Sequence, residues 1–301
     1  MAAVISILGP TAVGKSKLAI EIALSIKGEI ISADSMQVYR GMDIGTAKPT
    51  LKERQGIPHH LIDIRDPDEA WTVSDFTEQT NQLASEIVQR GKTPIIAGGT
   101  GLYLWALFEG FCFPIAAADK EVRQRLEKES LSELYSRLCR IDPKAAEKIH
   151  PNDQKRIVRA LEVYELTGEA ISKLQKDKEP RRSVADSEFK LIGLTLPREE
   201  LYKHIEKRID EMIKNDLIEE VKGLLAKGYS KDLPSFQALG YKEVVEYLDG
   251  KWSKEKMVEE LNKRTRNFAR RQMTWFKRFK NTKWFERPVD TRMILDYINS
   301  V

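Results

Sequence analysis

Cysteine is scarce in this chain of 301 residues, which contains only Cys112 and Cys139 and no CxxC motif. Two cysteines cannot form a disulfide framework or a cysteine-based zinc site, so the sequence predicts a protein of a reducing compartment without structural zinc. The histidines form no HExxH or His/Cys cluster either, and we interpret the adjacent His59 and His60 as loop or strand-edge residues.

Long apolar runs and targeting signals are also lacking. No stretch reaches the ~18 consecutive apolar residues that a membrane-spanning helix needs. The first residues have neither the basic region of a signal peptide nor the Arg- and Ser-rich composition of a transit peptide. We therefore expect a cytoplasmic protein.

Neither sign of charge dominates the composition, because 50 Lys and Arg face 46 Asp and Glu, a net charge of +4. The distribution is more informative than the total. Residues 263–280, KRTRNFARRQMTWFKRFK, are rich in basic side chains and contain no acidic one. On a helix, Phe268, Trp275, Phe276 and Phe279 can form one core-facing stripe and leave the arginines on the other face. That basic face is either an RNA contact or an ordinary solvated surface.

Apolar runs that alternate with helical patterns predict an α/β fold with a parallel sheet. Strands are expected at 2–8, 29–34, 60–64, 93–99, 189–196 and 283–285. Helices are expected from an N-cap at Ser74 to about Arg90, from about 100 to 108, and over 198–227, 242–248 and 253–280. Residues 115–186 contain no strand pattern and read as charged helices, with an exposed connector at 176–188. The predicted architecture is a P-loop NTPase-like parallel sheet flanked by helices (1–114 and 187–301), with an inserted all-helical domain (115–186).

The phosphate-binding motif GxxxxGK[ST] is complete between the first predicted strand and helix. Its backbone N–H groups can cradle phosphate oxygens, its lysine can reach the terminal phosphates, and its serine hydroxyl can ligate Mg²⁺. The motif indicates a di- or triphosphate with magnesium, ATP included, and does not specify the reaction. Its residues are Gly9, Pro10, Thr11, Ala12, Val13, Gly14, Lys15 and Ser16.

Two further segments end at the same predicted sheet edge, where ligands of parallel α/β proteins bind. Asp34 ends the second predicted strand and could cap the next turn, ligate a metal ion or act as a general base. Thr100 lies in the turn AGGTG, which is either a ligand contact or a tight strand-to-helix turn. No apolar strand ends in a clear late Walker-B aspartate, since Asp63 and Asp66 precede Pro67, so a motor ATPase is disfavoured. Arg208, by its local pattern, reads as part of a solvated helix face.

Taken in order along the chain, these segments resemble the bacterial tRNA isopentenyltransferase (dimethylallyltransferase) family. The resemblance covers nearly the whole chain, and its most specific block runs from Asp34 to Pro49. The basic helical segments favour the tRNA enzymes over the adenylate isopentenyltransferases, and no C-terminal zinc finger of the eukaryotic kind follows. The matching segments are GPTAVGKS, DSMQVYRGMDIGTAKP, PHHLID, AGGTGLY, HPNDQKRIVRALEVY, QALGYKEV and TRNFARRQMTWF.

The resemblance implies transfer of a dimethylallyl group from dimethylallyl diphosphate to N6 of adenine 37 in tRNAs that read codons beginning with U. The P-loop would then hold diphosphate with Mg²⁺ at Ser16. Separately from the resemblance, we expect a monomer. Asp34 matches the proposed general base, Thr100 the family's threonine in the GGT turn, and Arg208 an arginine that assists diphosphate binding or catalysis. Asp34 and Thr100 also belong to the implied tRNA contacts. The others are Ser35, Met36, Gln37, Arg123, Lys155, Arg156, Ile157, Val158, Arg159, Gln237, Ala238, Leu239, Gly240, Tyr241 and Lys242.

Two other function classes fit part of the pattern. A P-loop small-molecule kinase would use ATP as donor and need Asp34 near an acceptor hydroxyl. A nonenzymatic, nucleotide-gated RNA-binding protein would need the basic helix and not Asp34. Assays with unmodified tRNA and either donor separate the three.

Overall fold

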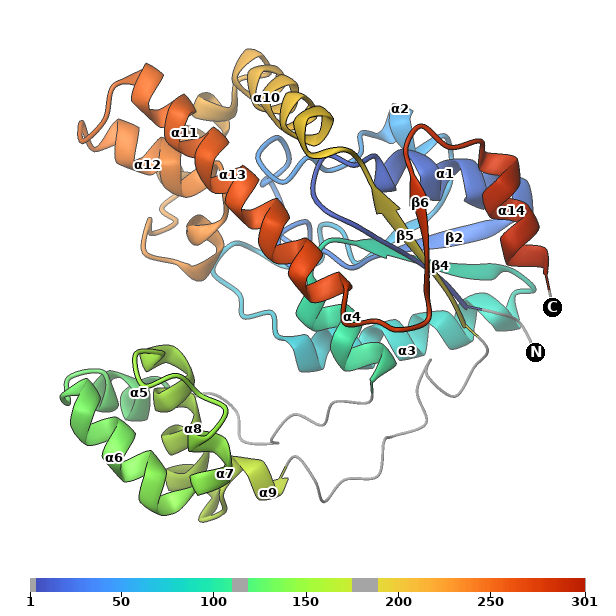
Figure 1. Cartoon of the computed structure of the whole chain (residues 1–301). Helices are drawn as coiled ribbons and strands as arrows, with labels where there is room; N and C mark the ends of the chain where they lie inside the picture. Colours follow the sequence, from blue (N-terminus) through green and yellow to red (C-terminus); the bar gives the residue numbers. More distant parts are fainter. Residues whose placement is uncertain (1–3, 110–118, 175–188, 301) are drawn as a thin grey trace. The chain divides into compact units, whose positions relative to one another are not determined.

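The computed structural model describes residues 4–109, 119–174 and 189–300 (Figure 1). The chain divides into two compact units, Met1–Phe108 with Val184–Val301 and, between them in sequence, Glu109–Ser183. The predicted domain boundaries near 114 and 187 and the predicted connector at 176–188 lie outside the described residues. That division of the chain stays a prediction.

The first unit contains one six-stranded sheet in the order β3-β2-β4-β1-β5-β6. Every neighbouring pair is parallel, which confirms the predicted α/β fold class. Because β1 and β4 lie at the centre, the turns that follow them meet at one edge of the sheet. The strands are β1 Val4–Leu8, β2 Gly28–Ser32, β3 His59–His60, β4 Thr93–Gly98, β5 Phe189–Thr195 and β6 Thr282–Glu286.

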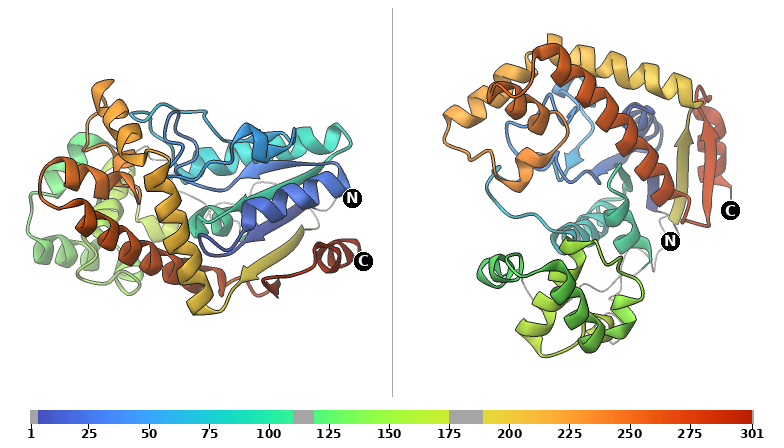
Figure 2. Two further views of the ribbon diagram at one scale, coloured as in Figure 1. Left: turned by 90° about the horizontal axis from the view of Figure 1, so that it is seen from above. Right: turned by 60° about the vertical axis from the view of Figure 1, so that its left-hand side comes forward.

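Helices cover both faces of this sheet (Figure 1, Figure 2). In β1, Ile5 and Ile7 belong to the core shared with α1, whereas Val4 and Leu8 belong to the core shared with α3 and α4. Two buried faces explain why the strands read as continuous apolar runs. The helices of this unit are α1 Lys15–Ile26, α2 Leu51–Arg54, α3 Val73–Gln89, α4 Gly101–Phe108, α10 Arg198–Lys214, α11 Leu217–Ala226, the 3₁₀ helix Pro234–Gln237, α12 Tyr241–Leu248, α13 Lys254–Phe276 and α14 Thr291–Asn299.

The described residues of the second unit form short helices around a small core of their own. Leu134 and Leu138 of α6 pack with Ile157 and Leu161 of α8, and all four side chains are buried. The helices are α5 Lys120–Leu126, α6 Leu131–Ile141, α7 Pro143–Ala146, α8 Gln154–Thr167 and α9 Ile171–Leu174. None of the helices in the described ranges is long and apolar enough to cross a membrane.

Several expected element boundaries were wrong, and one of them is the end of the basic helix, since α13 stops at Phe276 rather than at 280. The N-cap of α3 is Thr72 rather than Ser74, because the Thr72 hydroxyl and the Asp75 carboxylate form a capping box. The helix expected over 198–227 is interrupted at Asp216, whose φ of 65° breaks it into α10 and α11. The third strand ends at His60 rather than 64, since Leu61 and Asp63 also take positive φ.

The expected aromatic stripe on the basic helix is only partly confirmed. Phe276, the last residue of α13, and Phe279, which follows its end, are buried in the core shared with α3 and α4, as predicted. Phe268 is half-exposed and lies under the guanidinium of Arg271, 5.8 Å from its ring centroid. The helix instead buries Gln272, at 5% exposure, toward the sheet edge.

Candidate active site

The loop between β1 and α1 is the predicted phosphate-binding loop, and the structure gives it the expected strand before and helix after. Gly14, with a φ of 95°, is the N-cap of α1. The first N–H groups of a helix have no intrahelical partner, and the helix dipole adds partial positive charge there. This loop can therefore bind phosphate oxygens.

Lys15 folds back onto the loop. Its Nζ donates to the carbonyl oxygens of Gly9, at 2.9 Å, and Pro10, at 2.8 Å. Burial and then the neighbouring charge of Arg208 lower the pKa of Lys15 to about 7, and the Asp34 carboxylate opposes the shift. The ammonium is thus poorly solvated, and an anionic ligand in the loop would stabilise its charged form.

Asp34 and Thr100 are brought together by the tight contact between the ends of β2 and β4. The Thr100 backbone N donates to the Ala33 carbonyl at 3.1 Å, and the Ser35 backbone N donates to Thr100 Oγ1 at 3.0 Å. A Cβ on Gly98 would lie 2.1 Å from the Ala33 oxygen, so only glycine fits there. The Asp34 carboxylate accepts from the Met36 backbone N at 2.9 Å, which fixes its orientation.

Arg208 points from α10 to the phosphate-binding loop rather than to solvent. Its Nη1 donates to Thr11 Oγ1 at 3.0 Å. Burial lowers the pKa of Arg208, and the Asp34 carboxylate opposes that shift. The local pattern, which indicated a solvated helix face, was therefore wrong, and two cations and one carboxylate converge beside the loop.

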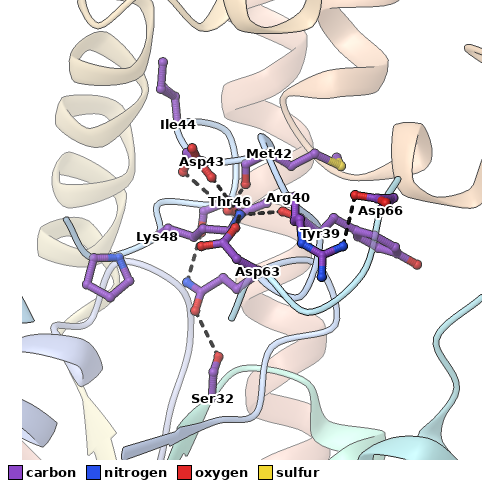
Figure 3. Close-up of polar contacts among 12 residues, drawn as sticks. Ser32, Tyr39, Arg40, Met42, Asp43, Ile44, Thr46, Lys48, Asp63 and Asp66 are labelled. Atoms are coloured by element: carbon purple, nitrogen blue, oxygen red, sulfur yellow. Dashed lines mark hydrogen bonds and ion pairs between the residues drawn. The ribbon is translucent and has the colours of Figure 1, made fainter. Parts of the chain in front are cut away.

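The loop from Asp34 to Pro49 is held by polar contacts that sequence reasoning missed (Figure 3). The buried Lys48 pairs with Asp43, at 2.6 Å, and Asp63, at 2.5 Å, and also donates to the Tyr39 carbonyl. The amide of Gln37, a predicted tRNA contact, accepts from Ser32 and donates to the Thr46 carbonyl. No spacing in the sequence indicates these pairings.

Glu220 anchors the same loop from α11. Its carboxylate accepts from the backbone N of Asp43, at 2.9 Å, and Ile44, at 2.8 Å. It also accepts from the hydroxyl of Tyr241, at 2.6 Å. Tyr241 is fully buried, so within the predicted tRNA-contacting segment 237–242 this side chain supports the loop, whereas Gln237 is exposed.

A cavity of about 560 Å³ opens beside the phosphate-binding loop. Its wall combines charged and apolar side chains of α1, of α10 and of the segment 43–55. The polar and cationic lining residues include Ser16, Lys17, Lys48 and Arg208, the carboxylates are Glu21, Asp43, Glu53 and Glu211, and the apolar ones include Ile20, Ile44, Ala47 and Met212. Within this mixed lining, the part formed by Ser16, Arg208 and Met212 places a hydroxyl, a cation and an apolar side chain together, which suits a phosphate group with a short apolar tail.

Among the described residues, no group of three or more His, Cys, Asp or Glu side chains could hold a metal ion by itself. A P-loop magnesium does not need such a group, because Mg²⁺ keeps several waters and takes oxygens from a hydroxyl and the ligand's phosphates. Ser16 is exposed at the cavity wall and can supply that hydroxyl. The residues present therefore fit a magnesium ion that enters with a diphosphate.

In the second unit, a buried carboxylate organises two of the predicted tRNA-binding arginines. Glu162 is fully buried and pairs with Arg123 Nε at 2.9 Å and with Arg159 Nη1 at 2.7 Å. Ile157 and Val158 belong to the unit's core. Any contact that this predicted segment makes through side chains must therefore come from its basic members.

Comparisons with known proteins agree on one family. A family model described as IPP transferase matches residues 37–279. A protein named tRNA dimethylallyltransferase from Pelotomaculum thermopropionicum is 49% identical over 93% of this chain and 89% of its own length. Another with that name, from Caldanaerobacter subterraneus subsp. tengcongensis, is 50% identical over 94% of this chain and 91% of its own length.

Solved structures give the same result. The full-length tRNA isopentenylpyrophosphate transferase of Bacillus halodurans is 42% identical, with a TM-score of 0.74 over 99% of this chain and 96% of that one. A eukaryotic dimethylallyltransferase, described as acting on tRNA, is 30% identical, with a TM-score of 0.85 over 99% of this chain and 80% of that one.

Proposed function

This chain belongs to the IPP transferase family, and we propose on that basis that it transfers a dimethylallyl group from dimethylallyl diphosphate to a tRNA. The proposed acceptor is N6 of adenine 37 in tRNAs that read codons beginning with U. The observation that carries the proposal is the convergence of Asp34, Lys15 and Arg208 at the phosphate-binding loop. One carboxylate and two cations are the groups that a transfer from a diphosphate to an amine requires.

In the proposed reaction, N6 of the adenine attacks C1 of the dimethylallyl group, and the C1–O bond to diphosphate breaks. The N6–H proton passes to the carboxylate of Asp34, which acts as general base. The diphosphate leaves with the electron pair, and Lys15, Arg208 and the backbone amides of the loop stabilise its negative charge. Bound Mg²⁺ would add a Lewis acid that neutralises the leaving group.

Thr100 has a positioning part in this scheme, because its Oγ1 accepts the Ser35 N–H and so fixes the segment that carries Asp34. The cavity beside Ser16 and Arg208 would hold the donor, with its apolar wall against the five-carbon tail. The target base has to leave its stack to reach a buried carbon atom. Proteins that read RNA sequence act mostly on such splayed-out loop bases.

The experiment that tests the function pairs unmodified tRNA with two alternative donors. We expect magnesium-dependent transfer from dimethylallyl diphosphate to tRNA and no turnover of ATP, detected by mass spectrometry of nucleosides and by phosphate release. Phosphorylation of a small acceptor by ATP would instead identify a kinase. Binding of tRNA without any transfer would identify a nonenzymatic RNA-binding protein.

The tRNA-binding proposal predicts an effect of single arginines in the second unit. Arg123→Ala or Arg159→Ala should weaken tRNA binding roughly tenfold, the value of about one charge-assisted hydrogen bond, and lower the salt dependence of binding. Each variant still leaves Glu162 one arginine and the Asp119 backbone N–H, so its carboxylate keeps partners. Fluorescence titrations at several salt concentrations measure both quantities.

The control for these variants is Arg292→Ala, an exposed helical arginine outside every predicted tRNA contact. It should leave the affinity for tRNA unchanged, and all three variants should bind dimethylallyl diphosphate like the parent. Parental affinity for tRNA in both second-unit variants would contradict the proposal. We further propose that the protein acts as a monomer in the cytoplasm, where tRNA is available.

A further inference from the structure

Helix α13 contains a buried amide side chain with no assigned part in the proposed reaction. The Thr11 backbone N donates to Gln272 Oε1 at 2.8 Å, and Gln272 Nε2 donates to the Gly99 carbonyl at 2.8 Å. Thr11 follows β1 and Gly99 follows β4, two strands that pair in the sheet. One side chain thus joins the phosphate-binding loop to the turn that carries Thr100.

The contact continues to the proposed catalytic cation. Thr11, whose backbone N–H is held by Gln272, accepts with its hydroxyl from Arg208 at 3.0 Å. A chain of hydrogen bonds therefore runs from the Gly99 carbonyl through Gln272 and Thr11 to the Arg208 guanidinium. Movement of the Gln272 amide would release Thr11, and with it the polar group that orients Arg208.

The chemistry at this position requires an amide. Its partners are a fixed donor, the Thr11 N–H, and a fixed acceptor, the Gly99 carbonyl, so the side chain must offer one acceptor and one donor. A carboxylate offers acceptors only, and methionine satisfies neither partner. A Cβ on Gly99 would lie 2.4 Å from Gln272 Nε2, which shows how closely the amide approaches that turn.

We propose that Gln272 is a positioning residue, which holds Thr11 and thereby aims the Arg208 guanidinium at the diphosphate leaving group. The expected effect on the transfer rate rests on the proposed function. The expected effect on diphosphate affinity does not, because it concerns only the phosphate-binding loop. The two hydrogen bonds of the Gln272 amide go to protein backbone groups, those of Thr11 and Gly99. Its influence passes through Thr11 to Arg208.

The direct test is a pair of near-isosteric substitutions, Gln272→Met and Gln272→Glu. We expect a fall of about 10- to 100-fold in the single-turnover transfer rate, because small misplacements of a catalytic group have effects of that size. The KM for tRNA should stay within about threefold, as expected when an interaction made in the transition state is lost. The matched control is Gln89→Glu, the same change at an exposed position at the end of α3. This variant should keep the parental transfer rate and the parental KM for tRNA.

A double-mutant cycle separates positioning from a general loss of packing. If Gln272 acts through Arg208, Gln272→Met should have little further effect on the rate in an Arg208→Ala background. A structural defect would lower the rate by the same factor in both backgrounds, and that result would overturn the proposal. Gly99→Ala displaces the Gln272 amide without altering it. On its own it should lower the transfer rate as Gln272→Met does, and in the Gln272→Met background it should lower the rate little further.

Inorganic diphosphate with Mg²⁺ supplies a readout that does not need the transfer reaction. Isothermal titration should show weaker diphosphate binding in Gln272→Met and parental binding in Gln89→Glu. This result can hold even if the parent fails to prenylate tRNA, an outcome that would refute the proposed function alone. Parental diphosphate affinity together with a parental transfer rate in Gln272→Met would overturn the positioning role.

Discussion

Replacing Asp34 by alanine should slow single-turnover transfer by about 10²- to 10⁴-fold, the usual contribution of a general base. In the proposed reaction the carboxylate acts mainly in the transition state, while the N6–H proton is being lost. Binding of tRNA and of dimethylallyl diphosphate should therefore stay within a few-fold of the parent. Rapid-quench single-turnover rates, with separate titrations of both ligands, measure these quantities.

Asp34→Asn sharpens this prediction, because an asparagine oxygen can still accept from the Met36 backbone N and keep the segment's geometry. It should lose nearly as much rate as Asp34→Ala. Asp68→Asn, at an exposed position, is the matched control and should retain the parental rate. A metal-ligand role predicts a different pattern, in which donor affinity falls strongly and recovers as magnesium rises. That pattern would contradict the assignment of Asp34 as base.

The second large effect should be a pH dependence of donor binding that is governed by Lys15. Its pKa is lowered to about 7 in the free protein, so above that pH the side chain is mostly neutral. A bound diphosphate favours the charged ammonium, and binding must then include uptake of a proton. The dissociation constant should be flat below pH 7 and rise about tenfold per pH unit above it.

Calorimetry in buffers of different ionisation enthalpy should detect this proton uptake directly. Two substitutions should move the midpoint of the pH dependence in opposite directions. Arg208→Gln removes a repelling charge and should shift it to higher pH, whereas Asp34→Asn removes an attracting one and should shift it to lower pH. A dissociation constant that does not change between pH 6 and about 9 would contradict the assigned pKa.

The parallel α/β core and the phosphate-binding loop were predictable because both depend on local patterns. Strands buried on two faces must be continuously apolar. The motif GxxxxGK[ST] between such a strand and a helix is specific for a phosphate-binding loop. Asp34 and Thr100 were also placeable, since the carboxyl ends of parallel strands share one edge of the sheet. Their exact roles remained open, because capping, metal binding and proton transfer all use the same side chains.

The ends of helices were less predictable where a single side chain or a single φ angle determines where a helix stops. The helical pattern of 198–227 is uninterrupted in sequence, yet Asp216 in a left-handed conformation splits it. The N-cap of α3 is Thr72 rather than the expected Ser74, because the reciprocal contact between Thr72 and Asp75 satisfies two backbone donors at the helix end. Neither feature alters the hydrophobic periodicity from which helices are predicted.

The sequence by itself therefore determined the class of fold, the position of the predicted phosphate-binding loop and, through its motifs, the family. Only the tertiary structure decided which distant polar groups complete the site. Arg208 and Gln272 lie 197 and 261 residues from Thr11, on helices whose local patterns indicate a solvated face and a basic surface. A hydrogen bond depends on the direction and distance of two atoms in space, and neither quantity is encoded by spacing along the chain.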